Sequence, residues 1–255
     1  MNKNFIAYFD YLGYKSFIEN NDLKEQARIM GNIFRDIENA LGKGKLKDAP
    51  HGVIADLSNS KINCINFSDT IVFWTNDDSE SSMFELLEVA YRFNWQCIDY
   101  FFPVRGSIVY DEIIHIGHKQ ESEAGGMYNI NSVFGKGIVR AHGKAEYQNW
   151  AGSVMDNTFI EILLERGYDV DKILAPYAKK HMIPYKGGIK ADYEEYALRL
   201  VNGNLNSKTL KNVSDGIRNN FGAYNKSVNN DSVQQKVENT LDFLKTFYDP
   251  SLDME

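Results

Sequence analysis

The strongest constraint on the fold is a short apolar run, rich in aromatic residues, that ends at an acidic residue. Residues 4–9 read NFIAYF, and Asp10 follows directly. A continuous apolar run of this length is typical of a strand that is buried on both faces. Apolar residues then recur at helical spacing over residues 15–41, with a break near residues 20–22. The sequence therefore predicts a central strand that ends at Asp10 and leads into helices.

The rest of the chain continues this alternation of strands and helices. The expected elements are a loop over 42–52, a hairpin of strands 61–67 and 71–75, a helix over 80–102, two strands within 103–118, an irregular connection over 122–133 and a helix within 134–147. This order predicts an α+β sandwich of the ferredoxin-like type. We expect residues 1–150 to form the core. Residues 151–255 are expected to be a mainly helical extension that completes the core or packs on it, with two helices over 207–248.

Composition excludes several classes of protein. The chain has 255 residues, 43% of them apolar, and a net charge of −7. No basic stripe favours nucleic acid as a partner, and no apolar run approaches the roughly 18–20 residues that cross a bilayer. Cys64 and Cys97 lie in apolar stretches without a CxxC pattern, which predicts reduced thiols. We therefore expect a cytoplasmic protein that binds neither nucleic acid nor membrane.

Two aspartates stand out by their positions. Asp10 follows the apolar strand, and Asp69 lies at the tip of the predicted hairpin. If that strand pairs with the hairpin, the two carboxylates meet and could hold hard divalent cations, which prefer oxygen ligands. A pair of such cations could clamp a triphosphate. The alternative is that Asp10 caps the following helix and Asp69 is an ordinary turn residue.

Backbone amides and cations offer further candidates for binding phosphate. Residues 12–14 form the turn into the first helix, where free amides suit an anion. Arg140 and Lys144 are four residues apart, so they share one helix face and could reach phosphate across a cleft or a dimer interface. A solvated face is the alternative. Arg105 begins a strand, where a structural role is favoured over contact with an anionic substrate.

Four segments together resemble the class III nucleotidyl cyclases. They are similar most of all to the pyrimidine cyclases of bacterial Pycsar antiphage systems. The segments are residues 9–14 (FDYLGY), 67–72 (FSDTIV), 103–108 (PVRGSI) and 135–141 (GKGIVRA), and they occur in the family's order. The resemblance spans about residues 4–150, and the C-terminal third has no counterpart.

The resemblance implies a mechanism and a set of partners. Two Mg²⁺ or Mn²⁺ ions would be held by Asp10, Asp69 and the carbonyl of Tyr11. The amides of Leu12, Gly13 and Tyr14 would cradle the β- and γ-phosphates. The ions would activate the ribose 3′-hydroxyl and stabilise the departing pyrophosphate. The family acts as a head-to-tail homodimer that builds each active site from both chains. In a Pycsar system, a separate effector protein reads the cyclic product.

The sequence departs from the purine cyclases at two places. The family's transition-state Asn and Arg fall on Val139 and Gly143, whereas Arg140 and Lys144 lie one residue further on. We assign the catalytic role to Arg140 and Lys144, as a hypothesis.

The second departure concerns recognition of the base. The Lys and Asp that read a purine are replaced by Ile65 and Ser132, and Asn63 could read a pyrimidine edge. The sequence therefore favours UTP slightly, with CTP as the alternative. Two other hypotheses stay open: a different enzyme on a palm-like sheet, although no GG[DE]EF motif occurs, and a catalytically inactive dimer that binds nucleotide.

Overall fold

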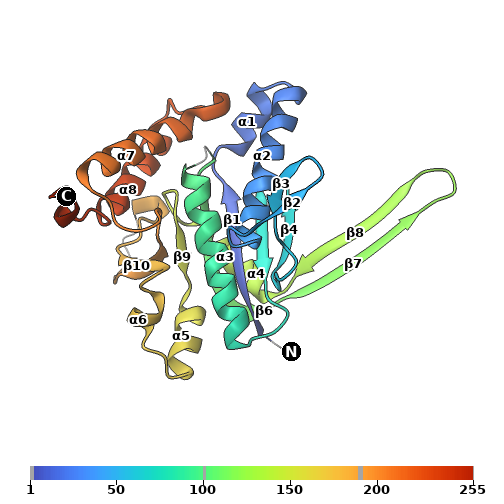
Figure 1. The fold of residues 1–255 in the computed structure, drawn as a ribbon, viewed down its shortest axis with the longest axis horizontal. Coiled ribbons are helices and arrows are strands. Elements are labelled where there is room, and N and C mark those ends of the chain that lie inside the picture. Colours follow the sequence, from blue (N-terminus) through green and yellow to red (C-terminus); the bar gives the residue numbers. More distant parts are fainter. Residues whose placement is uncertain (1–2, 100–101, 189–191, 255) are drawn as a thin grey trace.

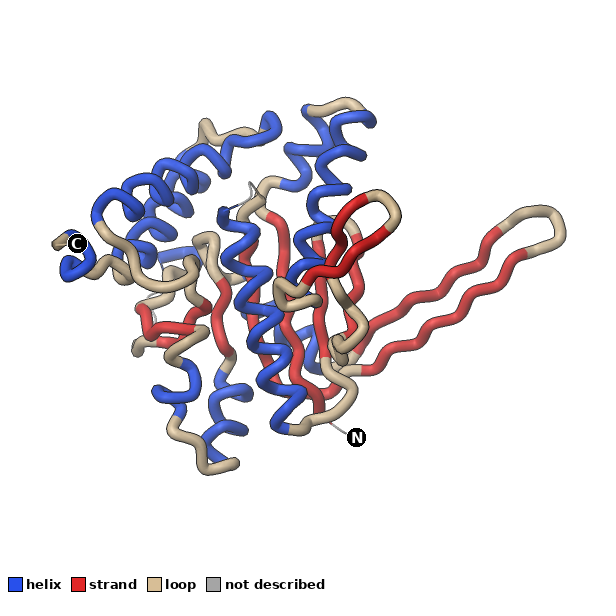
Figure 2. The backbone as a smooth tube through the Cα atoms, in the orientation of Figure 1, coloured by secondary structure: helices blue, strands red, loops and turns tan. Residues whose placement is uncertain are grey.

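A seven-stranded sheet forms the centre of the computed structural model, which describes residues 3–99, 102–188 and 192–254 (Figures 1 and 2). Its strand order is β10-β11-β9-β6-β1-β5-β4. The bounds are β1 Lys3–Tyr11, β4 Asn63–Phe67, β5 Thr70–Trp74, β6 Val104–Glu112, β9 Ser153–Met155, β10 Ala178–His181 and β11 Glu195–Leu198.

Strand β1 is the buried centre of this sheet. Phe5, Ile6, Ala7 and Phe9 are fully buried, and β1 pairs antiparallel with β5 on one side and β6 on the other. Apolar side chains on both faces of one strand can be buried only where both faces of the sheet are covered. The predicted central strand is therefore confirmed.

The first half of the chain has the ferredoxin-like order. Strands β4-β5-β1-β6 are neighbours in the sheet. The connections carry helices α1 (Tyr14–Asn20) and α2 (Leu23–Leu41) after β1, and α3 (Glu80–Asp99) after β5. Asp22, whose side chain accepts a hydrogen bond from the amide of Glu25 at 2.9 Å, caps α2 and explains the break. The α+β sandwich is confirmed. The third helix was expected over 80–102; the described part is helical to Asp99, residues 100–101 lie outside the described residues, and residue 102 is not helical.

Helices cover both faces of the sheet (Figure 1). On one face α2 and α3 pack over a core that includes Phe9, Phe73 and Phe93. On the other face α4 (Lys136–Glu146) packs over Ile6 and Tyr8. Helix α4 and β6 therefore reach the end of β1 at which Asp10 lies.

The C-terminal part extends the same sheet. Strand β9 pairs parallel with β6, and β11 and β10 follow it outward. The helical elements here are α5 Asn157–Glu165, α6 Val170–Leu174, η1 Lys186–Gly188, α7 Ser207–Gly222, η2 Ala223–Asn225, α8 Asp231–Lys245 and η3 Pro250–Asp253. The two helices expected over 207–248 are confirmed, and strands β9 to β11 add to the sheet in a part that was expected to be mainly helical. The division at residue 150 stays a prediction.

Two hairpins replace segments that were expected to be irregular. The expected loop over 42–52 contains all of β2 (Leu46–Ala49) and the start of β3 (Gly52–Ala55). The expected connection over 122–133 contains most of β8 (Met127–Phe134), which pairs with β7 (Ile114–Glu121). The β7–β8 pair projects from the body as a long arm (Figure 2). Most residues of both hairpins are exposed, so no alternation of apolar and polar residues marked them in the sequence.

Within the described residues, no helix combines the length and the apolar character that crossing a membrane requires.

Candidate active site

Asp10 and Asp69 meet at one end of the sheet. Asp10 pairs with Thr70 across β1 and β5, and the amide of Tyr11 donates to the carbonyl of Asp69 at 2.9 Å. The two-residue hairpin tip, Ser68-Asp69, has Ser68 in the left-handed region at φ 57°. The two aspartates are thus neighbours, although 59 positions separate them in the sequence.

The electrostatics of Asp10 reflect this crowding. Burial raises the pKa of Asp10, the positive charge and hydrogen bond of Arg105 oppose that effect, and the nearby Asp69 carboxylate raises the pKa further. A divalent cation bound between the two carboxylates would oppose the effects of burial and of charge repulsion, because it stabilises the charged form of both groups.

Arg105 faces Asp10 from the neighbouring strand β6. The two residues are register partners. Arg105 Nε donates to Asp10 Oδ2 at 2.9 Å, and Arg105 Nη2 lies 2.7 Å from the same oxygen. Arg105 also donates to the carboxylate and the backbone carbonyl of Glu146, at the end of α4. Lys186 donates to the same carboxylate.

Sequence reasoning favoured a structural role for Arg105 and did not identify Glu146 or Lys186. Glu146 and Lys186 come close to Arg105 only through the packing of α4 and the C-terminal segment. Strand pairing could have pointed to Arg105, because a strand that pairs antiparallel with residues 3–11 must place one of its residues opposite Asp10.

The turn after β1 is set by packing. The Tyr11 ring is buried against Phe93 and Phe102, so only its main chain can face the aspartates. The Leu12 amide donates to the carbonyl of Pro103 at 2.9 Å. This amide is therefore bonded within the protein, although it was predicted to bind phosphate. Gly13 has φ 79°, which glycine adopts readily. Gly13 and Tyr14 open helix α1.

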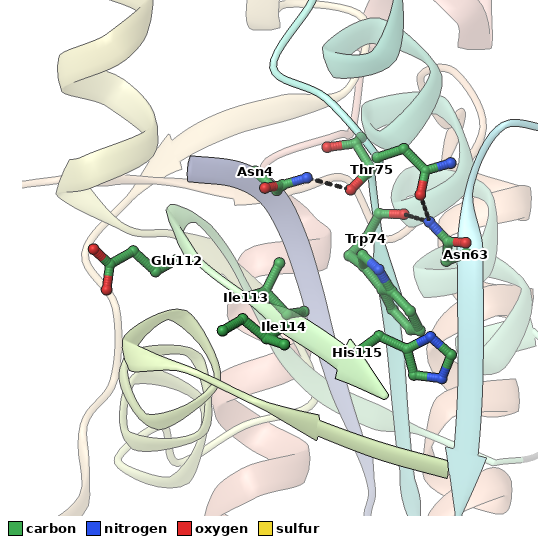
Figure 3. A pocket seen from close by; sticks show the side chains of 9 residues that line it. Asn4, Asn63, Trp74, Thr75, Glu112, Ile113, Ile114 and His115 are labelled. Atoms are coloured by element: carbon green, nitrogen blue, oxygen red, sulfur yellow. Dashed lines mark hydrogen bonds between the residues drawn. The ribbon is translucent and has the colours of Figure 1, made fainter. Parts of the chain in front are cut away.

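The three candidate base-reading residues lie apart from the aspartates. Asn63, at the far end of β4 from the hairpin tip, donates to the carbonyl of Trp74 at 3.2 Å and to Asn76 Oδ1 at 2.8 Å. It lines a cavity of about 440 Å³ that Trp74 and His115 also line (Figure 3). Ile65 packs in the apolar cluster under α4, and Ser132 is exposed on β8.

Arg140 and Lys144 are both engaged in ion pairs. Arg140 contacts Asp111 at 3.1 Å and Asp156 at 3.7 Å. Asp111 lies six residues beyond Arg105 on β6, about 20 Å away at the usual strand rise. Lys144 pairs with the buried Glu195. The structure therefore does not bring Arg140 to Asp10 and Asp69 of its own chain.

Asp10, Asp69 and the carbonyl of Tyr11 fit a divalent cation in the chemistry of their oxygen donors. Among the residues that the structure describes, no group of three or more His, Cys, Asp or Glu side chains is gathered closely enough to hold a metal. The donors on this chain are therefore few, and substrate oxygens or water would have to supply the remaining ligands, as is usual for Mg²⁺.

No protein-family model and no curated protein matches the sequence. Among solved structures, the guanylate cyclase domain of RhGC from Catenaria anguillulae in complex with GTP is similar at a TM-score of 0.49 and 8% identity, over 78% of this chain and 96% of that one. The catalytic core of a rhodopsin-guanylyl cyclase with converted specificity, in complex with ATPαS, gives 0.48 and 8% over 77% and 95%.

Proposed function

We propose that this protein is a nucleotide cyclase that converts a pyrimidine nucleoside triphosphate, UTP in preference to CTP, into the 3′,5′-cyclic monophosphate and pyrophosphate. The observation that carries the proposal is the meeting of Asp10 and Asp69 at adjacent strand ends. An ordinary helix cap or turn residue does not need a second carboxylate beside it, whereas two-metal chemistry does.

The reaction needs one bond to form and one to break. The ribose O3′ attacks the α-phosphorus, the bond from that phosphorus to the bridging oxygen of the β-phosphate breaks, and the hydroxyl proton leaves to water. Mg²⁺ or Mn²⁺ ions held by Asp10, Asp69 and the Tyr11 carbonyl would lower the pKa of the hydroxyl and offset charge on pyrophosphate. Arg105 orients the Asp10 carboxylate through its two donors.

The choice of a pyrimidine rests on what surrounds the candidate base-reading positions. Ile65 and Ser132 offer neither the cation nor the carboxylate that a purine-reading pair would supply. The side-chain nitrogen of Asn63 donates to Trp74 and Asn76, and its amide oxygen can accept a hydrogen bond from an N–H group of uracil or cytosine. Asn63 lines the same cavity as Trp74 and His115 (Figure 3).

The proposal includes a homodimer with active sites shared between chains. Arg140 lies far along the sheet from Asp10 and Asp69 of its own chain, so a catalytic Arg140 would have to serve the site of a second copy. The resemblance to Pycsar cyclases adds a role in antiviral defence, in which a separate effector protein reads the cyclic nucleotide.

A product assay tests the reaction. Purified protein is incubated with ATP, GTP, CTP or UTP and Mn²⁺, beside Asp10→Asn, and products are identified by mass spectrometry. We expect cyclic UMP from the wild type and none from the variant. Cyclic CMP would change the base, a cyclic purine would overturn the base argument, and no product from any nucleotide would favour the inactive nucleotide-binding dimer.

A further inference from the structure

The turn that follows Asp10 determines where the carbonyl of Tyr11 points. The amide of Tyr11 donates to the Asp69 carbonyl on one side of β1, and the amide of Leu12 donates to the Pro103 carbonyl on the other side, each at 2.9 Å. The peptide bond between Tyr11 and Leu12 is trans, and a trans peptide holds its C=O and N–H in opposite directions. The Leu12 bond therefore turns the Tyr11 carbonyl toward the side on which Asp69 lies.

The C-terminal extension holds Leu12 and the next residue in place. The Leu12 side chain packs against the apolar cluster that includes Ile217 and Phe221 of α7. Gly13 has φ 79°, and a Cβ at this position would lie 3.0 Å from Cδ of Lys226. The turn is thus enclosed by residues from the far end of the sequence.

Amide side chains tie the end of α1 to the linker between α7 and α8. This linker, residues 223–230, lies beside α1 (Figure 1). Asn21 Nδ2 donates to the Tyr224 carbonyl at 2.7 Å, and Asn20 Nδ2 donates to the Asn225 carbonyl at 2.8 Å. Asn225 Nδ2 donates in turn to Asn21 Oδ1 at 3.0 Å. Helix α1, which begins directly after Gly13, therefore cannot shift without breaking these bonds.

Two consecutive linker residues have a left-handed backbone. The φ angle is 58° at both Tyr224 and Asn225; asparagine tolerates this conformation, whereas a bulky residue such as tyrosine seldom adopts it. Residues in such conformations persist only where their surroundings hold them. The Tyr224 ring stacks on Phe102 at 6.2 Å between centroids and meets the ring of Phe17, in α1, at 6.3 Å. The linker thus has a fixed shape that fits α1.

We propose that residues 223–227 form a clasp that positions the turn after β1, and that the C-terminal extension thereby controls the affinity of the candidate site for divalent cations. The choice of a cation rests on the proposed function. Tyr224 and Asn225 are positioning residues, since they act through α1 and Leu12 and not by contact with the ion. A shift of the Leu12 peptide turns the Tyr11 carbonyl away, and a site with few protein donors is sensitive to the loss of one.

Asn225 offers a matched pair of variants for the test. Asn225→Gly and Asn225→Val both lose the side-chain bond to Asn21, but glycine adopts a φ of 58° readily and valine does not. The affinity for Mn²⁺ is measured by isothermal titration calorimetry on the full chain, without nucleotide and at fixed ionic strength. We expect Asn225→Val to bind Mn²⁺ about fivefold more weakly than Asn225→Gly does.

A second variant removes the ring contacts of the clasp. We expect Tyr224→Ala to bind Mn²⁺ about fivefold more weakly than the wild type. Tyr248→Ala is the control, because this tyrosine of the extension donates to Asp253; it should bind Mn²⁺ as the wild type does. Hydrogen exchange at the amides of residues 12–17 measures the positioning directly, and it should be faster in Tyr224→Ala and in Asn225→Val. Melting temperatures show that each variant is folded at the temperature of the titration.

Equal Mn²⁺ affinities in Asn225→Gly and Asn225→Val would overturn the role of the linker's backbone shape. Wild-type affinity in Tyr224→Ala would overturn the clasp itself, even if that variant melts earlier. Equal binding by the wild type and Asp69→Asn would also overturn it, since the ion would then lie elsewhere. The proposed cyclase activity is judged separately, because the calorimetry contains no nucleotide. If the expected affinities are found while no nucleotide is cyclised, the clasp stands and the proposed function fails.

Discussion

Arg105 and Asp10 form a mostly buried ion pair across β6 and β1, with Arg105 Nη2 2.7 Å from Asp10 Oδ2 and side chains 12% and 16% exposed. Removing one member of such a pair leaves a charge that nothing compensates. We expect Arg105→Met to lower the free energy of unfolding by about 3 kcal/mol. Chemical denaturation measures this change.

A metal ion can take over the role of the missing guanidinium in that variant. We therefore expect Mn²⁺ to raise the melting temperature of Arg105→Met by more than it raises that of the wild type. Combining the change with Asp10→Asn removes the uncompensated charge, so the double variant should be more stable than Arg105→Met alone. Equal responses to Mn²⁺ in Arg105→Met and the wild type would contradict this account.

Asp69 provides the most direct test of the metal site. We expect Asp69→Asn to abolish the rise in melting temperature that Mn²⁺ gives the wild type, and to lower cyclase turnover at least about a hundredfold. Asp48→Asn is the matched control, because it removes an exposed carboxylate from the other small hairpin. If Asp69→Asn keeps the full response to Mn²⁺, the ion binds elsewhere.

Complementation between two inactive variants tests the shared active site. We expect both Asp10→Asn and Arg140→Ala to lose turnover by orders of magnitude, because each removes one part of every site. Half of the dimers in an equal mixture would combine the two variants and hold one intact site of two. The mixture should therefore recover about a quarter of wild-type activity. Recovery has to follow subunit exchange, which is measured by labelling one variant.

The same experiment can contradict the assignment of Arg140. Wild-type turnover in Arg140→Ala would remove it from the machinery, and an inactive mixture of the two variants would place both residues in one chain's site. Arg140→Ala also breaks the contacts to Asp111 and Asp156, so its melting temperature has to be measured beside the activity.

Continuous apolar runs and helical spacing of apolar residues predicted the well-buried parts of the fold. Strand β1 and helix α3 were evident because most of their buried residues are apolar. Strand β8 was missed because all of its side chains are exposed or only partly covered. Strands β9 to β11 have only three or four residues each, too few for a period to show.

Only the part of the candidate site that depends on local sequence could be predicted. Asp10 and Asp69 each follow an apolar run, and pairing of those runs was enough to bring them together. The contacts of Glu146 with Lys186 depend on how a segment 40 residues away packs against α4. No local pattern encodes such a contact, since it results from tertiary packing.

Lys226 gives the last prediction, which concerns pH. The residue is 4% exposed, its amine lies 4.1 Å from the centre of the Phe102 ring, and a Cβ on Gly13 would come within 3.0 Å of its stem. Burial lowers the pKa of Lys226 to about 7, against 10.5 for an ordinary lysine. Between these two values the unfolded chain binds more protons than the folded one, so the stability contributed by this group rises with pH.

We expect Lys226→Met to reduce the slope of unfolding free energy between pH 7 and 9 by up to about 1.4 kcal/mol per pH unit. Chemical denaturation at pH 6.5, 7.5 and 9 measures the slope, and Lys245→Met, an exposed lysine at the end of α8, is the control. Identical slopes in Lys226→Met and the wild type would show that Lys226 keeps an ordinary pKa in the folded protein.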